Sequence, residues 1–190
     1  MLLAAVVLSA AATQAASAAW YVNGTVLTGT AALATTASVA EHVKLKAGGV
    51  TVECTVSTLT TAGGEIKSPN KLAASKITFN ECKGSGSCTV PSSIATVPVT
   101  AELTEQSLQD TATFTPQSGT LFATIKYEGA TCALAGTQPL TGKMTAKLPS
   151  GEEEETLQEV KANILEKSGE LKLGSSAAEF KGAALLKLGQ

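Results

Sequence analysis

Residues 77–91, Ile-Thr-Phe-Asn-Glu-Cys-Lys-Gly-Ser-Gly-Ser-Cys-Thr-Val-Pro, are the segment around which the rest of the chain is organised. A β-branched and aromatic run is followed by Gly and Ser and then by a second β-type run, which predicts two strands joined by a flexible turn. Cys82 and Cys88 lie at the two rims of that turn. A disulfide between them would close a short loop and stabilise the hairpin by about 2–3 kcal/mol in the chain-entropy model.

The start of the chain predicts export. Residues 1–18 combine an apolar stretch with a small-residue end, and Ala16-Ser17-Ala18 matches the A-x-A pattern of a signal-peptidase site. We therefore expect a signal peptide over 1–18 and a single β-rich domain over 19–190, in a secreted or cell-surface protein. No Lys or Arg precedes the apolar run, so either the signal is atypical or the true start lies further upstream.

An uncleaved membrane anchor is the rival interpretation of the same segment. A spanning helix needs about 20 apolar residues, and Ser9, Thr13 and Gln14 interrupt this run. We favour cleavage, with no membrane span in the mature chain.

Composition excludes one class of partner. The chain has 190 residues, 16% charged, with a formal net charge of −2, and all fourteen basic residues are lysine. The planar guanidinium that grips phosphate or reads guanine is therefore absent. We expect no nucleic-acid partner.

The four cysteines, Cys54, Cys82, Cys88 and Cys132, predict two disulfides in an exported chain. Three pairings are possible, and the sequence alone does not choose among them. Loop-closure entropy favours Cys82 with Cys88, which leaves Cys54 with Cys132. A zinc site would need CxxC-type spacing or several histidines, whereas this chain has C-x5-C and one histidine, so we expect no metal.

Strand signals follow one another along the chain. Residues 39–47 alternate between apolar and polar side chains, and Gly48-Gly49 then turns the chain into a β-type run over 50–56. Further strand candidates are Ile94–Leu103, Thr111–Thr115, Leu121–Tyr127, Thr131–Ala135 and Leu140–Leu148. Many short strands with turns at this spacing predict an all-β fold, an antiparallel β-sandwich or Greek-key barrel stapled by two disulfides.

Asn23-Gly24 is a strong turn signal and predicts a hairpin within residues 20–27. Asn23-Gly24-Thr25 is also a glycosylation sequon, but we favour the interpretation of these residues as a turn without a glycan. We interpret the adjacent Trp20 and Tyr21 as a plug at one end of the core, and the alternative is the start of a strand that inserts into a neighbouring subunit.

Residues 152–168 leave two structures open. Leu157, Val160 and Ile164 have helical spacing, and the glutamates before them suit a helix N-terminus. The pattern alone slightly favours a helix.

Candidate chemistry is sparse, and we predict no catalytic, cofactor-binding or metal-binding residue. His42 is the only histidine, and it lies in a predicted strand of alternating polar and apolar residues. The sequence has no G-x-S-x-G nucleophile elbow whose serine could form a catalytic triad with it. A glycosidase needs only two carboxylates, yet Asp110 is the sole aspartate and Glu152–Glu155 resembles a solvated charge run. The glycine-rich residues 83–87 lack the pattern of a phosphate-binding loop.

The chain resembles a group of uncharacterised secreted bacterial four-cysteine β-rich proteins with no established activity. The resemblance is carried by Val52-Glu53-Cys54, Phe79-Asn80-Glu81-Cys82, Cys88-Thr89-Val90-Pro91, the run Thr131–Gly136 and Leu171–Gly174. It implies a small exported β-domain without catalytic residues. It also implies extended structure over 152–168, and on that ground we expect a strand there.

Three functions remain as hypotheses. The first is a non-catalytic structural or interaction module at the cell surface, associating with itself through an edge or N-terminal strand or with another surface protein. The second is a small-ligand-binding β-barrel, and the third is a hydrolase with a carboxylate pair.

Overall fold

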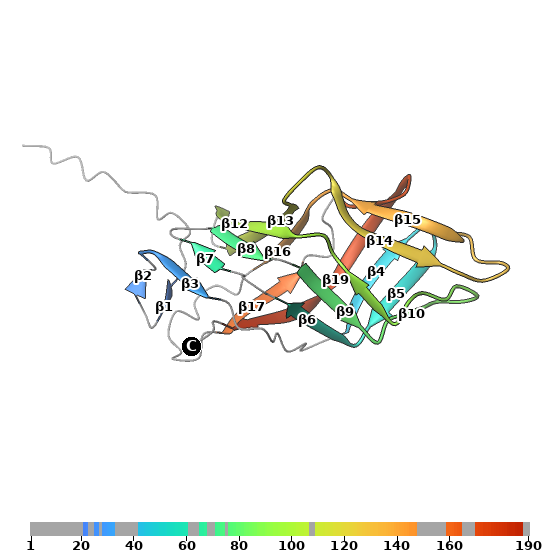
Figure 1. Cartoon of the computed structure of the whole chain (residues 1–190), viewed down its shortest axis with the longest axis horizontal. Coiled ribbons are helices and arrows are strands. Elements are labelled where there is room, and N and C mark those ends of the chain that lie inside the picture. Colours follow the sequence, from blue (N-terminus) through green and yellow to red (C-terminus); the bar gives the residue numbers. More distant parts are fainter. Residues whose placement is uncertain are drawn as a thin grey trace, which may run out of the picture.

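The computed structural model describes residues 21–22, 25–26, 28–32, 42–60, 65–67, 71–74, 76–106, 109–147, 159–164 and 170–187. All regular secondary structure in these ranges is β-strand, and every pairing between the strands is antiparallel (Figure 1). The predicted all-β antiparallel fold with two disulfides is therefore confirmed. Within the described ranges, no helix has the length and apolar character needed to cross a bilayer.

The first half of the described chain carries strands β1 to β10. They are β1 (Tyr21–Val22), β2 (Thr25–Val26), β3 (Thr30–Ala32), β4 (Val43–Ala47), β5 (Val50–Cys54), β6 (Val56–Thr60), β7 (Glu65–Lys67), β8 (Lys71–Ala74), β9 (Lys76–Asn80) and β10 (Lys83–Gly84).

The second half carries strands β11 to β19. They are β11 (Ser93–Ala95), β12 (Val99–Gln106), β13 (Gln109–Pro116), β14 (Leu121–Tyr127), β15 (Gly136–Thr141), β16 (Met144–Lys147), β17 (Glu159–Ile164), β18 (Lys172–Leu173) and β19 (Ser176–Lys187).

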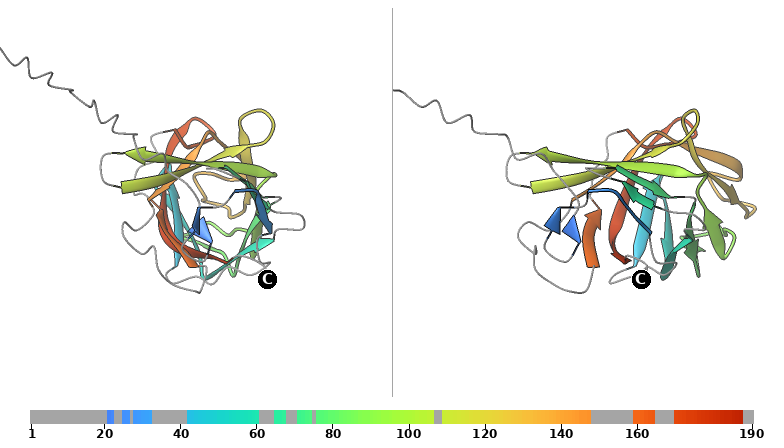
Figure 2. Two further views of the ribbon diagram at one scale, coloured as in Figure 1. Left: turned by 90° about the vertical axis from the view of Figure 1, so that its left-hand side faces the viewer. Right: turned by 60° about the vertical axis from the view of Figure 1, so that its left-hand side comes forward.

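A curled seven-stranded sheet, in the order β14-β15-β18-β19-β4-β5-β10, forms one half of the molecule. Strand β9 leads directly into β10 and pairs with β11, and Thr96 just after β11 forms a bridge with Ala123 of β14. These pairings bring the last strand back to the first, so the strands form a closed ring around a common core (Figure 2). Of the two predicted architectures, this half follows the barrel.

The long strand β19 links this ring to a second run of strands. Its residues 178–181 pair with β4, and its residues 182–187 pair with β17. From β17 the order continues through β16, β13, β12, β8 and β7 to β3. In Figure 1, β1, β2 and β3 lie at the left-hand end of the molecule and the β14–β15 connection lies at the right-hand end.

The predicted alternation over residues 39–47 is confirmed where the structure describes it. Val43, Leu45 and Ala47 of β4 are buried, whereas the lysines between them are exposed. Gly48 and Gly49 then turn the chain with φ values of 54° and 80°, which side chains with a Cβ rarely adopt. The resulting β4–β5 hairpin places an apolar face of both strands inside the ring.

The predicted hairpin within residues 77–91 is wrong in its details. Strand β9 pairs with β6 and β11, and its partner β11 begins at Ser93, beyond the predicted second strand. The intervening chain first forms β10 against β5 and then a loop, in which Thr89 bridges to Glu128. The predicted turn is present, because the Cys88 amide donates to the Ser85 carbonyl at 3.2 Å and Gly86 has a φ of 63°, but it leads from β10 to the Thr89 bridge and does not pair β9 with a second strand.

The predicted disulfide pairing is also wrong. Cys54 bonds to Cys82 and Cys88 bonds to Cys132, so both favoured pairs, Cys82 with Cys88 and Cys54 with Cys132, are corrected. Chain entropy favours the nearest cysteines, but it ignores which residues the sheets place opposite each other. All four cysteines are disulfide-bonded, as expected.

Two further predictions have mixed outcomes. The segment Thr131–Ala135 is a turn instead of a strand, because Cys132 is tied to Cys88 within it, and β15 begins only at Gly136. Within 152–168 the structure describes Glu159–Ile164, which is strand β17. The extended structure is confirmed there, and the remaining residues of that segment lie outside the described ones.

Candidate interaction surface

The N-terminal strands lie at one end of the strand order. β3 pairs with β7 on one edge, with Thr30 opposite Lys67 and Ala32 opposite Glu65. Among the described residues, no strand pairs with the other edge of β3. Such an edge presents unpaired backbone N–H and C=O groups, which can template pairing with another chain.

Strands β1 and β2 form a two-stranded sheet of their own. Tyr21 is opposite Val26 and Val22 is opposite Thr25, a register that leaves Asn23-Gly24 as the connection and confirms the predicted hairpin. In the described part of the chain this hairpin pairs with no strand of the larger sheets. Trp20, the other residue of the aromatic pair, lies outside the described residues, as does the predicted signal peptide.

The same region is devoid of charge. None of residues 1–40 is Asp, Glu, Lys, Arg or His, and the first charged residue is Glu41. Residues 20–40, which include β1 to β3, also contain no proline. Charged side chains and prolines are the usual devices that keep an edge strand from pairing with other molecules. The lack of charge and proline can be read from the sequence, but only the strand order shows that β3 is an edge strand.

Strand β7, the hydrogen-bonded neighbour of β3, carries charged side chains. In β7, Lys67 and Glu65 are both charged, and their side chains form an ion pair with an N···O distance of 3.3 Å. A strand with alternating charges resists edge-to-edge association. Without β3, strand β7 would be the edge of this sheet, and its charges would protect it from pairing with other molecules. The uncharged β3 covers that protected edge.

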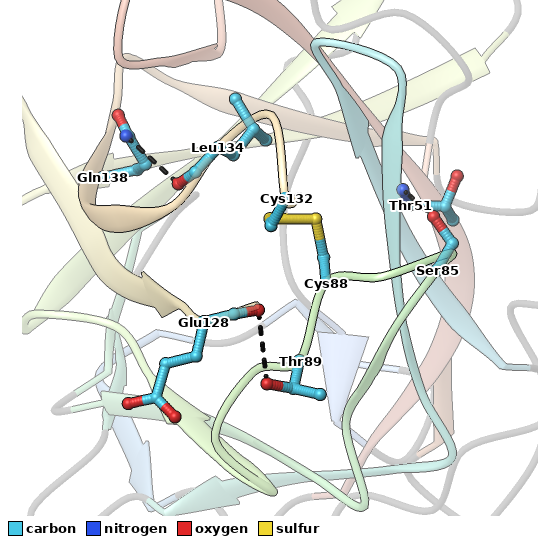
Figure 3. The surroundings of a disulfide bond; sticks show 8 residues. All are labelled: Thr51, Ser85, Cys88, Thr89, Glu128, Cys132, Leu134 and Gln138. Carbon is cyan, nitrogen blue, oxygen red and sulfur yellow. Dashed lines mark hydrogen bonds between the residues drawn. A yellow bond between two sulfur atoms is a disulfide. The ribbon is translucent and has the colours of Figure 1, made fainter. Parts of the chain in front are cut away.

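The opposite end of the molecule is tied down by the Cys88–Cys132 disulfide (Figure 3). The amide of Thr89 donates to the Glu128 carbonyl at 2.8 Å, and the amide of Glu128 donates back at 2.9 Å. On the other flank, the Ser85 amide donates to the Thr51 carbonyl and the Ser85 hydroxyl accepts from the Thr51 amide. These contacts join two loops and strand β5 into one cap.

Two close approaches show how tightly that cap is packed. A Cβ at Gly129 would lie 2.0 Å from the carbonyl oxygen of Ser87, so no larger residue fits there. Leu134, partly buried, packs against the core, and its Cδ2 would lie 3.0 Å from a Cβ added at Gly48 in the β4–β5 turn. The cap is a packed structural element.

His42 lies on the exposed outer face of the ring, where it contacts the carboxylate of Glu53. Lys44 forms an ion pair with the same carboxylate at 3.5 Å. The hydrogen bond from His42 and the charge of Lys44 lower the pKa of Glu53. All three side chains are more than a third exposed, so this cluster is a solvated surface network.

Other described carboxylates form surface ion pairs with lysine. Glu128 forms an ion pair with Lys126 at 2.6 Å, which lowers the pKa of Glu128 and raises the pKa of Lys126. Asp110 lies in β13, opposite Glu105 of β12, and Glu152–Glu155 lies outside the described residues. No cluster of three or more His, Cys, Asp or Glu residues suited to a metal ion occurs in the described ranges.

The ring encloses an apolar cavity of about 30 Å³. Val52, Phe79, Ile94, Phe122 and Phe180 are among the residues that line it. The one hydroxyl in the lining, that of Thr96, already accepts a hydrogen bond from the Ile77 amide at 2.9 Å. A space of this size holds at most a water or two, and its lining is apolar apart from Thr96.

Comparison with known proteins adds no relative: no family model matches the chain, and no curated protein or solved structure is significantly similar to it. The resemblance to secreted bacterial four-cysteine proteins stays a prediction.

Proposed function

We propose that this chain is an exported, non-catalytic interaction module that associates with copies of itself through its N-terminal strands. The observation that carries the proposal is the uncharged strand β3, whose outer edge has no strand partner among the described residues. Backbone hydrogen bonds from a second copy would satisfy that edge by strand addition.

Two features support an extracellular or cell-surface location. Disulfides persist mainly in oxidising compartments, and both bridges of this chain are buried and structural. Residues 1–18 have the composition of a signal peptide. A bacterial origin rests on the resemblance alone.

The two alternative functions have less support. A ligand-binding barrel needs an interior with room and a few convergent polar groups, whereas the cavity found inside the ring is small and apolar. A carboxylate-pair hydrolase needs two acidic groups facing each other in a cleft. Glu53 and Glu128, whose pKa values are lowered by their partners, are exposed and ion-paired with lysine or histidine.

The proposal is tested by comparing the oxidised chain that begins at Ala19 with one that begins at Ala34, using size-exclusion chromatography with light scattering. The longer chain is expected to form oligomers. The shorter chain lacks β1 to β3 and would end its sheet at β7, whose Glu65 and Lys67 disfavour pairing, so it is expected to be a monomer. Circular dichroism checks that both chains are folded, and folded monomers from both would overturn the proposal.

A further inference from the structure

The two native bridges skip the shortest loop that the cysteines can close. Cys54 and Cys82 are 28 positions apart and Cys88 and Cys132 are 44 apart, whereas Cys82 and Cys88 are only 6 apart. The five residues between the last two are Lys-Gly-Ser-Gly-Ser, a flexible connection. In an unfolded chain this local pair meets more often than any other.

The size of that preference follows from the entropic cost of closing a loop, which grows as (3/2)RT ln n for a loop of n residues. For an ideal chain the local pair closes about tenfold more often than Cys54 with Cys82, and about twentyfold more often than Cys88 with Cys132. The first bridge formed during oxidation is then not a native one.

We propose that this protein reaches its native bridges through a Cys82–Cys88 intermediate, which is converted by thiol–disulfide exchange. The thiolate of Cys54 attacks the Sγ of Cys82, a Cys54–Cys82 bond forms, the Cys82–Cys88 bond breaks, and Cys88 leaves as a thiolate. No electrons are gained or lost in that step. An external disulfide such as oxidised glutathione then oxidises Cys88 and Cys132 and is itself reduced to two thiols.

The sheet register directs the exchange to the correct sulfur. Glu53 is opposite Lys83 and Val56 is opposite Asn80, so a continuous antiparallel ladder places Cys54 opposite Cys82. Formation of this ladder brings the attacking thiolate to Cys82. The two hydrogen bonds of Ser85 with the backbone of Thr51 in β5 extend the same ladder beyond Cys82 and hold it in this register.

The exchange has to precede closure of the ring. In the folded protein each of the four cysteines is at most 7% exposed, which removes the sulfurs from attacking thiolates. The chain is accordingly a substrate for thiol–disulfide exchange only while it is incompletely folded. A dithiol oxidoreductase with isomerase activity is the class of partner that would accelerate the step.

The test is oxidative refolding of the reduced chain from Ala19 to Gln190 in a mixture of reduced and oxidised glutathione. Free thiols are alkylated at successive times and the products are digested with trypsin without reduction. Cleavage after lysine places Cys54, Cys82, Cys88 and Cys132 in four separate peptides, residues 47–67, 77–83, 84–126 and 127–143. Mass spectrometry of linked peptides therefore distinguishes every possible bridge.

Peptides 77–83 and 84–126 are expected to be linked first, in about tenfold excess over 47–67 linked to 77–83, and to be replaced by that native link after a lag. In a Cys88→Ser, Cys132→Ser variant the local bridge cannot form, so the Cys54–Cys82 link is expected without a lag. If a native bridge dominates the earliest samples, or if the lag is the same in both chains, the inference is overturned.

Discussion

Cys54 and Cys82 lie directly opposite each other, with Cα atoms 4.0 Å apart, at the point where a two-stranded ladder bends from one sheet into another. On one side of the bend β5 pairs with β10, and on the other β6 pairs with β9. The neighbouring pair Thr55 and Glu81 is joined by a side-chain hydrogen bond. The bridge thus fixes the junction that allows the ring to close.

Removal of either bridge is expected to cost similar stability. The chain-entropy model gives about 3.6 kcal/mol for the 28-residue loop of Cys54 and Cys82, and about 4.0 kcal/mol for the 44-residue loop of Cys88 and Cys132. Urea unfolding of the two double Cys→Ala variants measures both losses. A loss below about 1 kcal/mol for either variant would contradict a structural role for that bridge.

Gly129→Ala is expected to destabilise the cap strongly. Its φ of 130° is a conformation that glycine alone adopts readily, and the new Cβ would lie 2.0 Å from the backbone oxygen of Ser87. Gly86→Ala is the matched control, because Gly86 also has a positive φ but nothing within 4 Å of an added Cβ. We expect about 1–2 kcal/mol for Gly86→Ala and clearly more for Gly129→Ala by thermal unfolding. Equal losses would contradict the close approach.

Thr96→Val tests the single polar contact in the lining of the ring cavity. The hydroxyl of Thr96 accepts the Ile77 amide hydrogen, and valine of similar shape would leave that buried donor unpaired. The expected loss is about 1–3 kcal/mol by urea unfolding. Thr96→Ser keeps the acceptor and is the control for the polar term, and a valine variant more stable than the serine variant would refute the assignment.

The burial of Tyr127 leads us to expect that the free energy of unfolding falls at alkaline pH. Burial raises the pKa of Tyr127 from 10.0 to about 12, so the native state favours the neutral phenol. The stabilisation is complete below pH 10 and is lost as the pH rises towards 12, by at most about 3 kcal/mol. Unfolding free energies of the parent and of Tyr127→Phe across this range should diverge, with the flatter curve for phenylalanine. Parallel curves would contradict the burial of the hydroxyl.

The sequence predicts this fold well where periodicity and turn chemistry are local. The β4–β5 hairpin follows from alternation and Gly48-Gly49, and β14 coincides with the predicted run Leu121–Tyr127. It fails where distant strands decide the outcome: the disulfide pairing depends on the register between β5 and β10, which no local pattern encodes. The helical spacing of Val160 and Ile164 is overridden by pairing of β17 with β19.

The sequence alone predicts only part of the candidate interaction surface. The aromatic pair beginning at Trp20 indicates strand exchange only as the alternative to a core plug, and the absence of charge before Glu41 can be read directly from the chain. That β3, rather than β1, ends the large sheet follows only from the pairing of β3 with β7 and of β7 with β8.

The most direct test of the central claim is light scattering on the full oxidised chain from Ala19 with one substitution, Thr30→Lys. Thr30 is exposed on β3, and a lysine there supplies the charge that this edge lacks. Thr100→Lys, at an exposed position of β12 that is paired with β13 on one side and with β8 on the other, is the matched control. Oligomers are expected for the parent and the control and monomers for Thr30→Lys; the same mass for all three chains would rule out self-association through the edge of β3.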